Sequence, residues 1–165
     1  MALNVDKVGT TYPAYTYEVS REKIREYAAA LGEQDPRYFA ADDSCVAPPT
    51  FAACFTIIKG GQAAFADPEL GTHPKLVHGS QSYRFGDRPL RPGDVLECTP
   101  RIADISVRGA NEFMVTEVDC RFVDTGELAV VSEATIVFLG SAPGAPAGAD
   151  GATAASGTSD QDGAA

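Results

Sequence analysis

The spacing of apolar residues in the first third of the chain predicts a short strand followed by a helix. Residues 15–19 alternate in the manner of a strand, and Ser20 then precedes the segment Arg21–Leu31. The apolar positions of that segment recur at the spacing of one helical face: Ile24, Tyr27, Ala28 and Leu31. We therefore expect one buried helix face. Ser20 is a favourable N-cap and Gly32 a favourable C-terminal stop.

A second helical segment, Thr50–Phe65, is apolar on nearly all sides and is bounded by Pro49 and Pro68. An apolar segment of this length predicts a buried helix. The Gly60-Gly61 pair within it predicts a weak point or kink, and a place where other parts of the chain approach closely.

The second half of the chain alternates with the period of strands. The expected strands are Lys75–Phe85, Asp94–Val107, Glu112–Val123 and Leu128–Leu139. Turn residues at 109–111 and 124–127 join the last three, and Pro100 predicts a bulge or an edge position. The order of elements predicts an α+β fold with an antiparallel sheet.

From Ser141 onward the sequence contains no aromatic or branched aliphatic residue. Such a segment cannot bury enough surface to offset its ordering entropy. We expect one domain over residues 1–140 and a disordered tail over residues 141–165.

Charge and composition narrow the classes of function. The net charge of −10 lacks the basic footprint of a nucleic-acid-binding protein. The sequence has no apolar run of about 20 residues and no secretory leader, so we expect a cytoplasmic protein that does not contact a membrane. Two histidines and four scattered cysteines suggest neither a metal site nor another cofactor. Cys98 and Cys120 fall in apolar strand patterns and are expected in the core.

Four short segments occur in an order that resembles a known family. They are residues 27–36, 47–51, 78–83 and 88–94. Together they resemble the MaoC-like N-terminal dehydratases and the UPF0336 family, and most of all the non-catalytic subunits of actinobacterial (3R)-hydroxyacyl-ACP dehydratase. The resemblance implies a hot-dog fold, in which an antiparallel sheet wraps a central apolar helix. It also implies a role in the dehydration of hydroxyacyl thioesters, or the hydration of enoyl thioesters, in fatty-acid metabolism.

The catalytic motif of that family, roughly G-D-x-N-P-x-H, is altered in this chain. Its Asp and His hold the water that is added or removed. Here Glu33 stands at the Asp position and Tyr38 at the His position, and a frame that begins at Asp35 places Ala40 at the His position. Tyrosine, with a pKa near 10, is a poor base at neutral pH. The resemblance therefore implies a partner, a hot-dog subunit that carries the dyad, with Tyr38 as a packed aromatic and Glu33 as a solvated loop residue.

The resemblance also implies a surface for an acyl-CoA or acyl carrier protein thioester. The candidate substrate-binding residues are Thr50, Phe51, Cys54, His78, Gly79, Gln81 and Arg84. His78 either lines an acyl channel or contacts the partner, or is a partly buried structural histidine, which is the interpretation we favour. Cys54 either faces the channel or is an inert buried thiol. The arginines between Arg84 and Arg108 either bind phosphate or are charges that protect strand edges.

Two other functions compete with the role of a non-catalytic subunit. One is an acyl-thioester-binding or regulatory module without activity. The other is a hot-dog thioesterase, which the sequence disfavours because Thr50–Phe65 contains no Asp or Glu to activate water.

Overall fold

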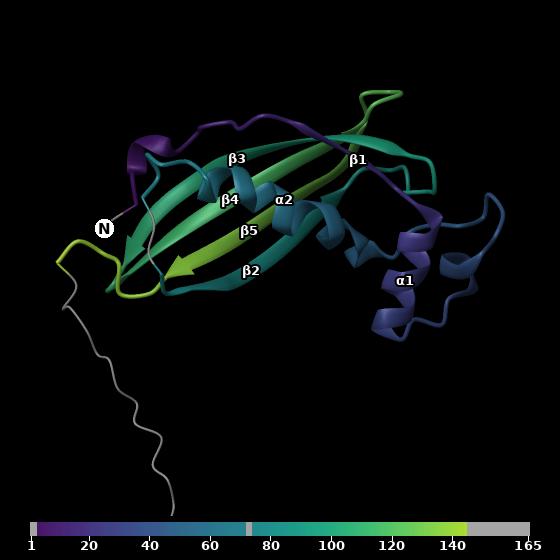
Figure 1. The fold of residues 1–165 in the computed structure, drawn as a ribbon, viewed down its shortest axis with the longest axis horizontal. Coiled ribbons are helices and arrows are strands. Elements are labelled where there is room, and N and C mark those ends of the chain that lie inside the picture. The colour runs from purple at the N-terminus through teal and green to yellow at the C-terminus, as the bar shows by residue number, and fades with distance from the viewer. Residues whose placement is uncertain (1–2, 72–73, 145–165) are drawn as a thin grey trace, which may run out of the picture.

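The computed structural model describes residues 3–71 and 74–144 and has a five-stranded antiparallel sheet with a helix lying across it (Figure 1). The strands are β1 (Tyr15–Glu18), β2 (Leu76–Phe85), β3 (Val95–Arg108), β4 (Asn111–Phe122) and β5 (Leu128–Phe138). The helices are α1 (Arg21–Leu31) and α2 (Ala53–Phe65), with short 3₁₀ turns at Val5–Lys7, Pro36–Phe39 and Pro49–Ala52. The sheet order is β1-β3-β4-β5-β2. The predicted α+β class and antiparallel sheet are confirmed.

Helix α1 begins and ends where its capping residues predict. The Ser20 hydroxyl accepts a hydrogen bond from the Lys23 amide at 3.0 Å, and Gly32 adopts a φ of 72°. Ile24 and Ala28 are buried as expected, but Leu31 is 53% exposed and its predicted burial is wrong. Figure 1 shows α1 at one end of the molecule, beyond the sheet, so its last turn has little to pack against.

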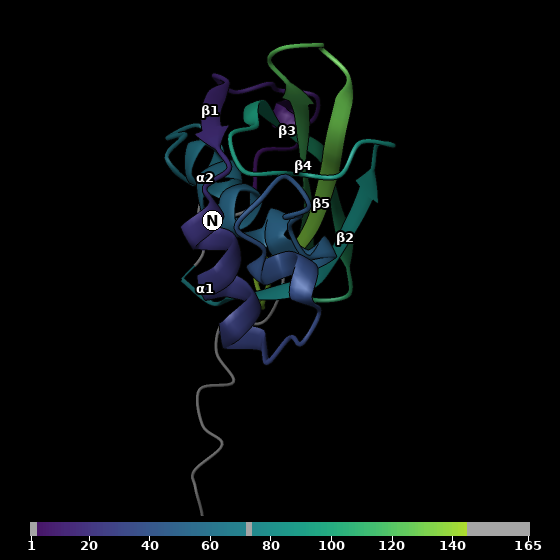
Figure 2. The same ribbon diagram turned by 90° about the vertical axis from the view of Figure 1, so that its right-hand side faces the viewer.

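Helix α2 packs against the sheet through one face only. Its buried residues are Phe55, Thr56, Gly60 and Ala64. The turned view of Figure 2 shows α2 on one side of β3, β4 and β5. The prediction of burial on all sides is wrong, since Ile57 and Ile58 are 38% and 68% exposed. The sheet of a single chain therefore covers only one side of this apolar helix.

The Gly60-Gly61 pair does not interrupt α2, which is helical throughout. A Cβ atom on Gly60 would lie 2.5 Å from Cγ2 of Val118 on β4. The glycine therefore serves the close approach of helix and sheet that the sequence predicts, and the helix continues through the pair.

Strand β4 shows the cleanest alternation in the sheet. Its even-numbered residues from 112 to 122 are buried and face α2. Cys98 on β3 and Cys120 on β4 are direct register partners and fully buried, as predicted. The sequence predicted a bulge or an edge position at Pro100. Pro100 lies just beyond the residues of β3 that pair with β1, which end at Cys98. The bulge of β3 lies elsewhere, between Ile102 and Asp104.

Strand β2 carries a bulge that the sequence did not indicate. Its pairing with β5 shifts between His78 and Ser80, so Gly79 has no opposing residue. One extra residue in a strand changes which side chains face the core. His78 and Gln81, three residues apart, consequently face the same side, towards α2.

Beyond β5 the described chain continues to Gly144. Ser141 and Ala142 are buried, and the Ala142 amide donates to the Ala110 carbonyl at 3.1 Å. Most of the tail expected from Ser141 onward lies outside the described residues. Among the described residues, no helix has both the length and the apolar character that a membrane crossing requires.

Candidate functional site

A cavity of about 210 Å³ lies between α2 and the neighbouring strands β2, β4 and β5. Its lining residues are Thr56, Ile57, Gly61, Phe65, Leu76, His78, Thr116, Val118, Ser132, Ala134 and Ile136. The wall is mainly apolar, with a few hydroxyl groups, as is usual for small-molecule sites. An acyl chain matches this character.

Small side chains, and threonine hydroxyls that donate to backbone carbonyls, leave this space open. Gly61 on α2 and Ala134 on β5 contribute little volume to the wall. The Thr56 hydroxyl donates back to the Ala52 carbonyl at 2.8 Å, and the Thr116 hydroxyl to the Ala134 carbonyl at 3.5 Å. Nothing in the sequence indicated the part played by Thr56 and Thr116.

Gln81 lies on β2 beside Ser132, a residue of the cavity wall, and its side-chain amide nitrogen is engaged in hydrogen bonds. Nε2 donates to the Ser132 hydroxyl at 2.8 Å and to the Glu133 carbonyl at 2.9 Å. Its Oε1 atom is buried and has no hydrogen-bond partner among the described residues. An acceptor without a donor inside a protein is costly.

Tyr83 follows Gln81 by two residues on the same face of β2 and was missed by the sequence analysis. Its hydroxyl is buried and, within the described residues, is also without a hydrogen-bond partner. Burial raises the pKa of Tyr83, and the nearby Thr56 hydroxyl offsets part of that rise. The spacing of two from Gln81 was the available signal, because alternate residues of a strand share a face.

The structure places His78 in the cavity wall. The ring is exposed, and Nε2 lies 2.9 Å from the Ser80 carbonyl oxygen. The expected partial burial of His78 is therefore wrong, although its ring has a hydrogen-bond partner as a structural histidine would. Cys54 on α2 is half-buried, and burial raises the pKa of its thiol, so it is protonated at neutral pH.

The remaining candidate residues lie away from the cavity wall. Phe51 is fully buried and packs against the rings of Tyr17, Tyr27 and Phe55. Thr50 is exposed, and its carbonyl accepts the Tyr27 hydroxyl at 2.8 Å.

Two more candidates lie on β2. Gly79 lines a hollow on the outer face of the sheet. Arg84 is exposed. Of the predicted set, the residues that line the cavity include His78 but none of the others.

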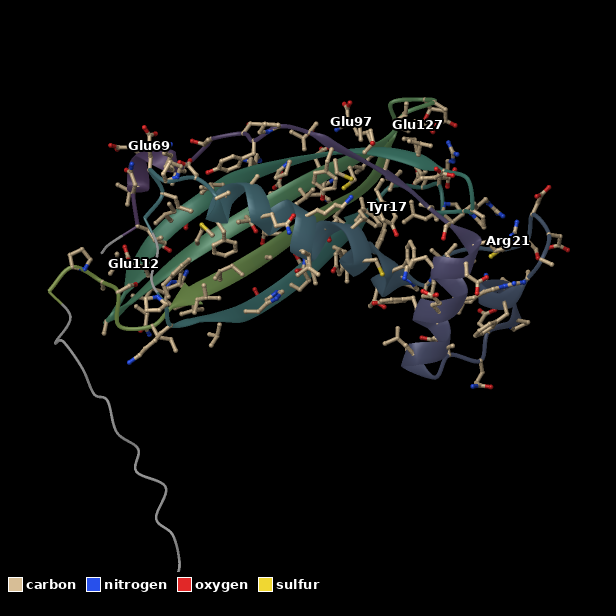
Figure 3. The ribbon with its side chains drawn as sticks, viewed as in Figure 1. Tyr17, Arg21, Glu69, Glu97, Glu112 and Glu127 are labelled. Atoms are coloured by element: carbon tan, nitrogen blue, oxygen red, sulfur yellow. The ribbon has the colours of Figure 1, made fainter. Side chains whose placement is uncertain are left out.

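The loop that corresponds to the family's catalytic motif is held at its end by hydrogen bonds from two arginines of α1. Arg21, labelled in Figure 3, donates to the carbonyls of Ala40 and Asp42 at 2.9 Å, and Arg25 donates to the Phe39 carbonyl at 3.1 Å. Tyr38 packs against the core, as expected. No hydrogen bond between the side chains of Glu33 and Tyr38 is found in the described structure.

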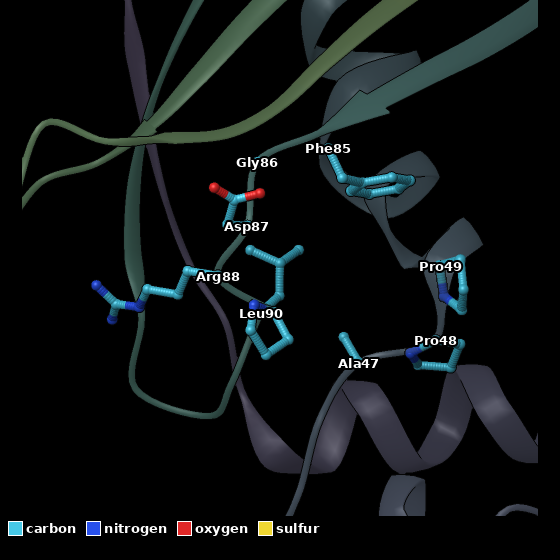
Figure 4. Close-up of a pocket in the computed structure, with 9 residues that line it drawn as sticks. Ala47, Pro48, Pro49, Phe85, Gly86, Asp87, Arg88 and Leu90 are labelled. Atoms are coloured by element: carbon cyan, nitrogen blue, oxygen red, sulfur yellow. The ribbon is translucent and has the colours of Figure 1, made fainter.

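A second cavity of about 250 Å³ lies near the entry to α2 (Figure 4). It is lined by Ala47–Pro49 and Phe85–Leu90. Arg88 extends away from the two prolines in Figure 4. Its guanidinium binds Asp94 and Asp124, the latter at 2.9 Å, and it stacks over Phe122.

Two of the five arginines between Arg84 and Arg108, Arg88 and Arg101, form ion pairs with nearby carboxylates. Besides Arg88, Arg101 binds Glu117 at 3.0 Å. Arg108 lies over the Phe113 ring. These contacts favour the structural interpretation of the basic segment over phosphate binding. In the part of the chain that the structure describes, no group of three or more His, Cys, Asp or Glu side chains could hold a metal ion.

Comparison with known protein families matches this chain to one of them. The model of the family described as "FAS1-like, dehydratase domain region" matches residues 6–128. A UPF0336 protein of Thermobifida fusca is 38% identical over 87% of this chain and 98% of its own length. A UPF0336 protein of Streptomyces griseus is 37% identical over 83% of this chain and 95% of its own.

Solved structures share the fold. The HadBC (3R-hydroxyacyl-ACP dehydratase) complex of Mycobacterium tuberculosis matches with a TM-score of 0.63 and 26% identity, over 77% of this chain and 92% of that chain. The ChsH1-ChsH2 complex of the same organism matches with a TM-score of 0.60 and 17% identity, over 83% and 88%. The predicted hot-dog fold is confirmed.

Proposed function

Because this chain belongs to the FAS1-like dehydratase family, we propose that it is the substrate-binding, non-catalytic subunit of a heteromeric (3R)-hydroxyacyl-thioester dehydratase. The observation that carries the proposal is an acyl-sized cavity in a chain with Glu33 and Tyr38 at the positions of the family's dyad. The complex would act in fatty-acid metabolism, on CoA or carrier-protein thioesters.

The chemistry requires groups that this segment lacks. Dehydration removes a proton from Cα and hydroxide from Cβ, so a base and an acid must be positioned together. Tyr38 packs against the core, and no hydrogen bond joins its side chain to that of Glu33 among the described residues. A second hot-dog subunit with an intact Asp/His pair would supply both groups, and this chain would hold the acyl part.

Exposed apolar residues along α2 and β2 support such a partner. They are Ile57, Ile58, Phe65, Leu76, Val77 and Phe85. In the described sheet β2 has a neighbour on one side only, which leaves its other edge open for pairing. The HadBC and ChsH1-ChsH2 structures are themselves complexes, as their names state.

The test is co-expression with a dyad-bearing hot-dog subunit encoded beside this chain. We expect the purified single chain not to hydrate crotonyl-CoA, and the pair to do so, measured as loss of enoyl-thioester absorbance. Replacing the partner's catalytic Asp with Asn should abolish the activity of the pair. Full-speed hydration by the single chain would refute the non-catalytic role.

A surface variant tests the partner interface in the same experiment. Ile58→Glu places a charge on the most exposed apolar side chain of α2 and should prevent co-purification of the two subunits. Val123→Glu is the matched control, since Val123 is 58% exposed and lies just beyond β4, towards the β4–β5 turn. Thioester binding without hydration, with every dyad-bearing partner, would favour the regulatory module instead.

A further inference from the structure

The residues that line the cavity beside α2 differ in exposure from one end of it to the other. Four of them are exposed: Ile57, Phe65, Leu76 and His78. Four others are buried: Thr56, Thr116, Val118 and Ser132. Most of the exposed side chains lie together at one end and most of the buried ones at the other, so the cavity has a mouth and a floor.

The mouth lies at the end of α2 and the start of β2. The ring of Phe65 packs beside that of Phe138, with 6.4 Å between their centroids, and Phe138 is the direct partner of Leu76 in the sheet. Phe65 and Leu76 also belong to the apolar surface assigned above to the partner subunit, as does Ile57. A thioester whose reacting carbons lie at the partner's Asp/His pair would therefore extend its distal carbons into this cavity.

The floor is built by residues of three elements. Val118 on β4 and Ser132 on β5 are direct partners in the sheet. Val118 packs closely under α2, where a Cβ atom on Gly60 would lie 2.5 Å from its Cγ2. Thr56 on α2 lies next to Tyr83, which is the partner of Ser132 on β2 and packs against the core. An acyl chain that reaches the floor therefore meets packed side chains behind it.

The distance from mouth to floor sets how much of a chain the cavity can hold. Ser132 and Ile136 both line it and are four residues apart on β5, which is roughly 13 Å along a strand. Thr56 and Phe65 are nine residues apart on α2, which is roughly 14 Å along a helix. An alkyl zigzag with bonds of about 1.5 Å advances about 1.3 Å per carbon, so about ten carbons span this length.

We propose that Val118 and Ser132 form a stop that limits the substrate to straight acyl chains with about ten carbons beyond C3. The inference rests on the proposed function, which orients the chain with its thioester at the partner subunit. It gives this subunit the selection of acyl-chain length. Ala134 lies on β5 between the mouth and the floor, opposite Thr116, and its small side chain leaves the passage to the floor open.

The test is a series of straight-chain acyl-CoA thioesters from butyryl-CoA to stearoyl-CoA, used below the concentrations at which they form micelles. Binding is measured by titration calorimetry on the full chain, alone and with its dyad-bearing partner. Each added methylene should tighten binding by up to about fourfold until the chain reaches the floor. Methylenes beyond a total of about thirteen carbons should add nothing.

Ala134→Leu moves the stop towards the mouth. Ala134 lies two residues nearer the mouth than Ser132, which is roughly 7 Å along the strand, so the limit should shorten by about five carbons. The affinity for butyryl-CoA should not change. Thr135→Leu is the matched control, because this neighbouring residue lines a hollow on the outer face of the sheet and should keep the wild-type limit. Val118→Ala opens the floor and should lengthen the limit, a shift that loss of the fold would not produce.

Four outcomes would overturn the inference. They are an unbroken gain to stearoyl-CoA in the wild type, an unmoved limit in Ala134→Leu, an equal shift in Thr135→Leu, and no acyl-CoA binding by the chain or the complex. Since binding needs no turnover, the two proposals can fail separately. A pair of subunits that never hydrates crotonyl-CoA would refute the proposed function while a shortened limit in Ala134→Leu still supported the stop, and hydration with an unmoved limit would do the reverse.

Discussion

At the scale of single residues, Gly60 marks the closest approach of α2 to the sheet. A methyl group there would lie 2.5 Å from Cγ2 of Val118, whose side chain is itself buried. Gly60→Ala should therefore lower the free energy of unfolding by about 1–3 kcal/mol, measured by chemical denaturation.

Gly61→Ala is the paired control for this change. A Cβ on Gly61 would meet Cε2 of Phe65 at 3.3 Å, and Phe65 is partly exposed and can move. Alanine also favours a helix over glycine by about 1 kcal/mol, so this variant should be neutral or stabilising. Equal destabilisation by both variants would show that the need for glycine at position 60 comes from the helix itself and not from its contact with Val118.

Some residues could not be placed from the sequence because their roles depend on distant partners. Glu112 is almost fully buried, and its Oε1 accepts the Leu3 amide at 2.9 Å. Figure 3 shows it at the end of the molecule away from Arg21. Nothing near position 112 in the sequence indicates the N-terminal segment as its partner.

At the scale of elements, the N-terminus of α1 offers a direct test of local sequence signals. Ser20→Ala removes the acceptor of the Lys23 amide and should lower the free energy of unfolding by about 1 kcal/mol, measured by thermal or urea denaturation. Ser20→Asp keeps an acceptor at the cap and should retain the wild-type stability. A loss of equal size in both variants would contradict the capping role.

The elements were predictable where local chemistry defines them. Caps, turn glycines and strand alternation fixed the bounds of α1, β3, β4 and β5 to within about one residue. The bulge at Gly79 was not predictable, because it follows from pairing with β5 and not from the residues of β2 alone.

At the scale of the whole molecule, an ion cluster ties the N-terminal segment to the loop after α2. Asp67 binds Lys7 at 3.0 Å and accepts the Tyr12 hydroxyl at 3.0 Å. The hydrogen bond from Lys7 is the largest cause that holds the pKa of Asp67 below its usual range. Burial, aided by Asp67, raises the pKa of Tyr12 to about 12, so this residue is neutral at physiological pH.

The sign of the pH effect follows from the lowered pKa. Asp67 contributes stability above its unfolded pKa of about 3.9, and that contribution is lost as the pH falls through the folded pKa. Asp67→Asn should therefore be less stable than wild type at pH 7 and should lose less stability between pH 5 and pH 3. Thermal melts across this range measure it. Asp6→Asn, an exposed neighbour, should follow the wild-type profile.

The covering of α2 shows what a single sequence can establish about the whole molecule. The apolar composition of residues 50–65 correctly predicted that the helix needs burial. It could not indicate that this chain buries only one side and leaves Ile57 and Ile58 exposed. A hydrophobic pattern records how much surface must be covered, and not whether the cover comes from the same chain.

The unpaired Gly79 reverses the alternation of inward and outward side chains along β2. Before it, even-numbered residues face the helix, and after it, odd-numbered residues do, as His78 and Gln81 show. A strand of the same length without the bulge would turn Val77 inward in place of His78, and an aliphatic side chain would replace an imidazole at the cavity wall. The gain or loss of a bulge at constant length is thus a route by which related chains exchange polar and apolar linings without substituting any lining residue.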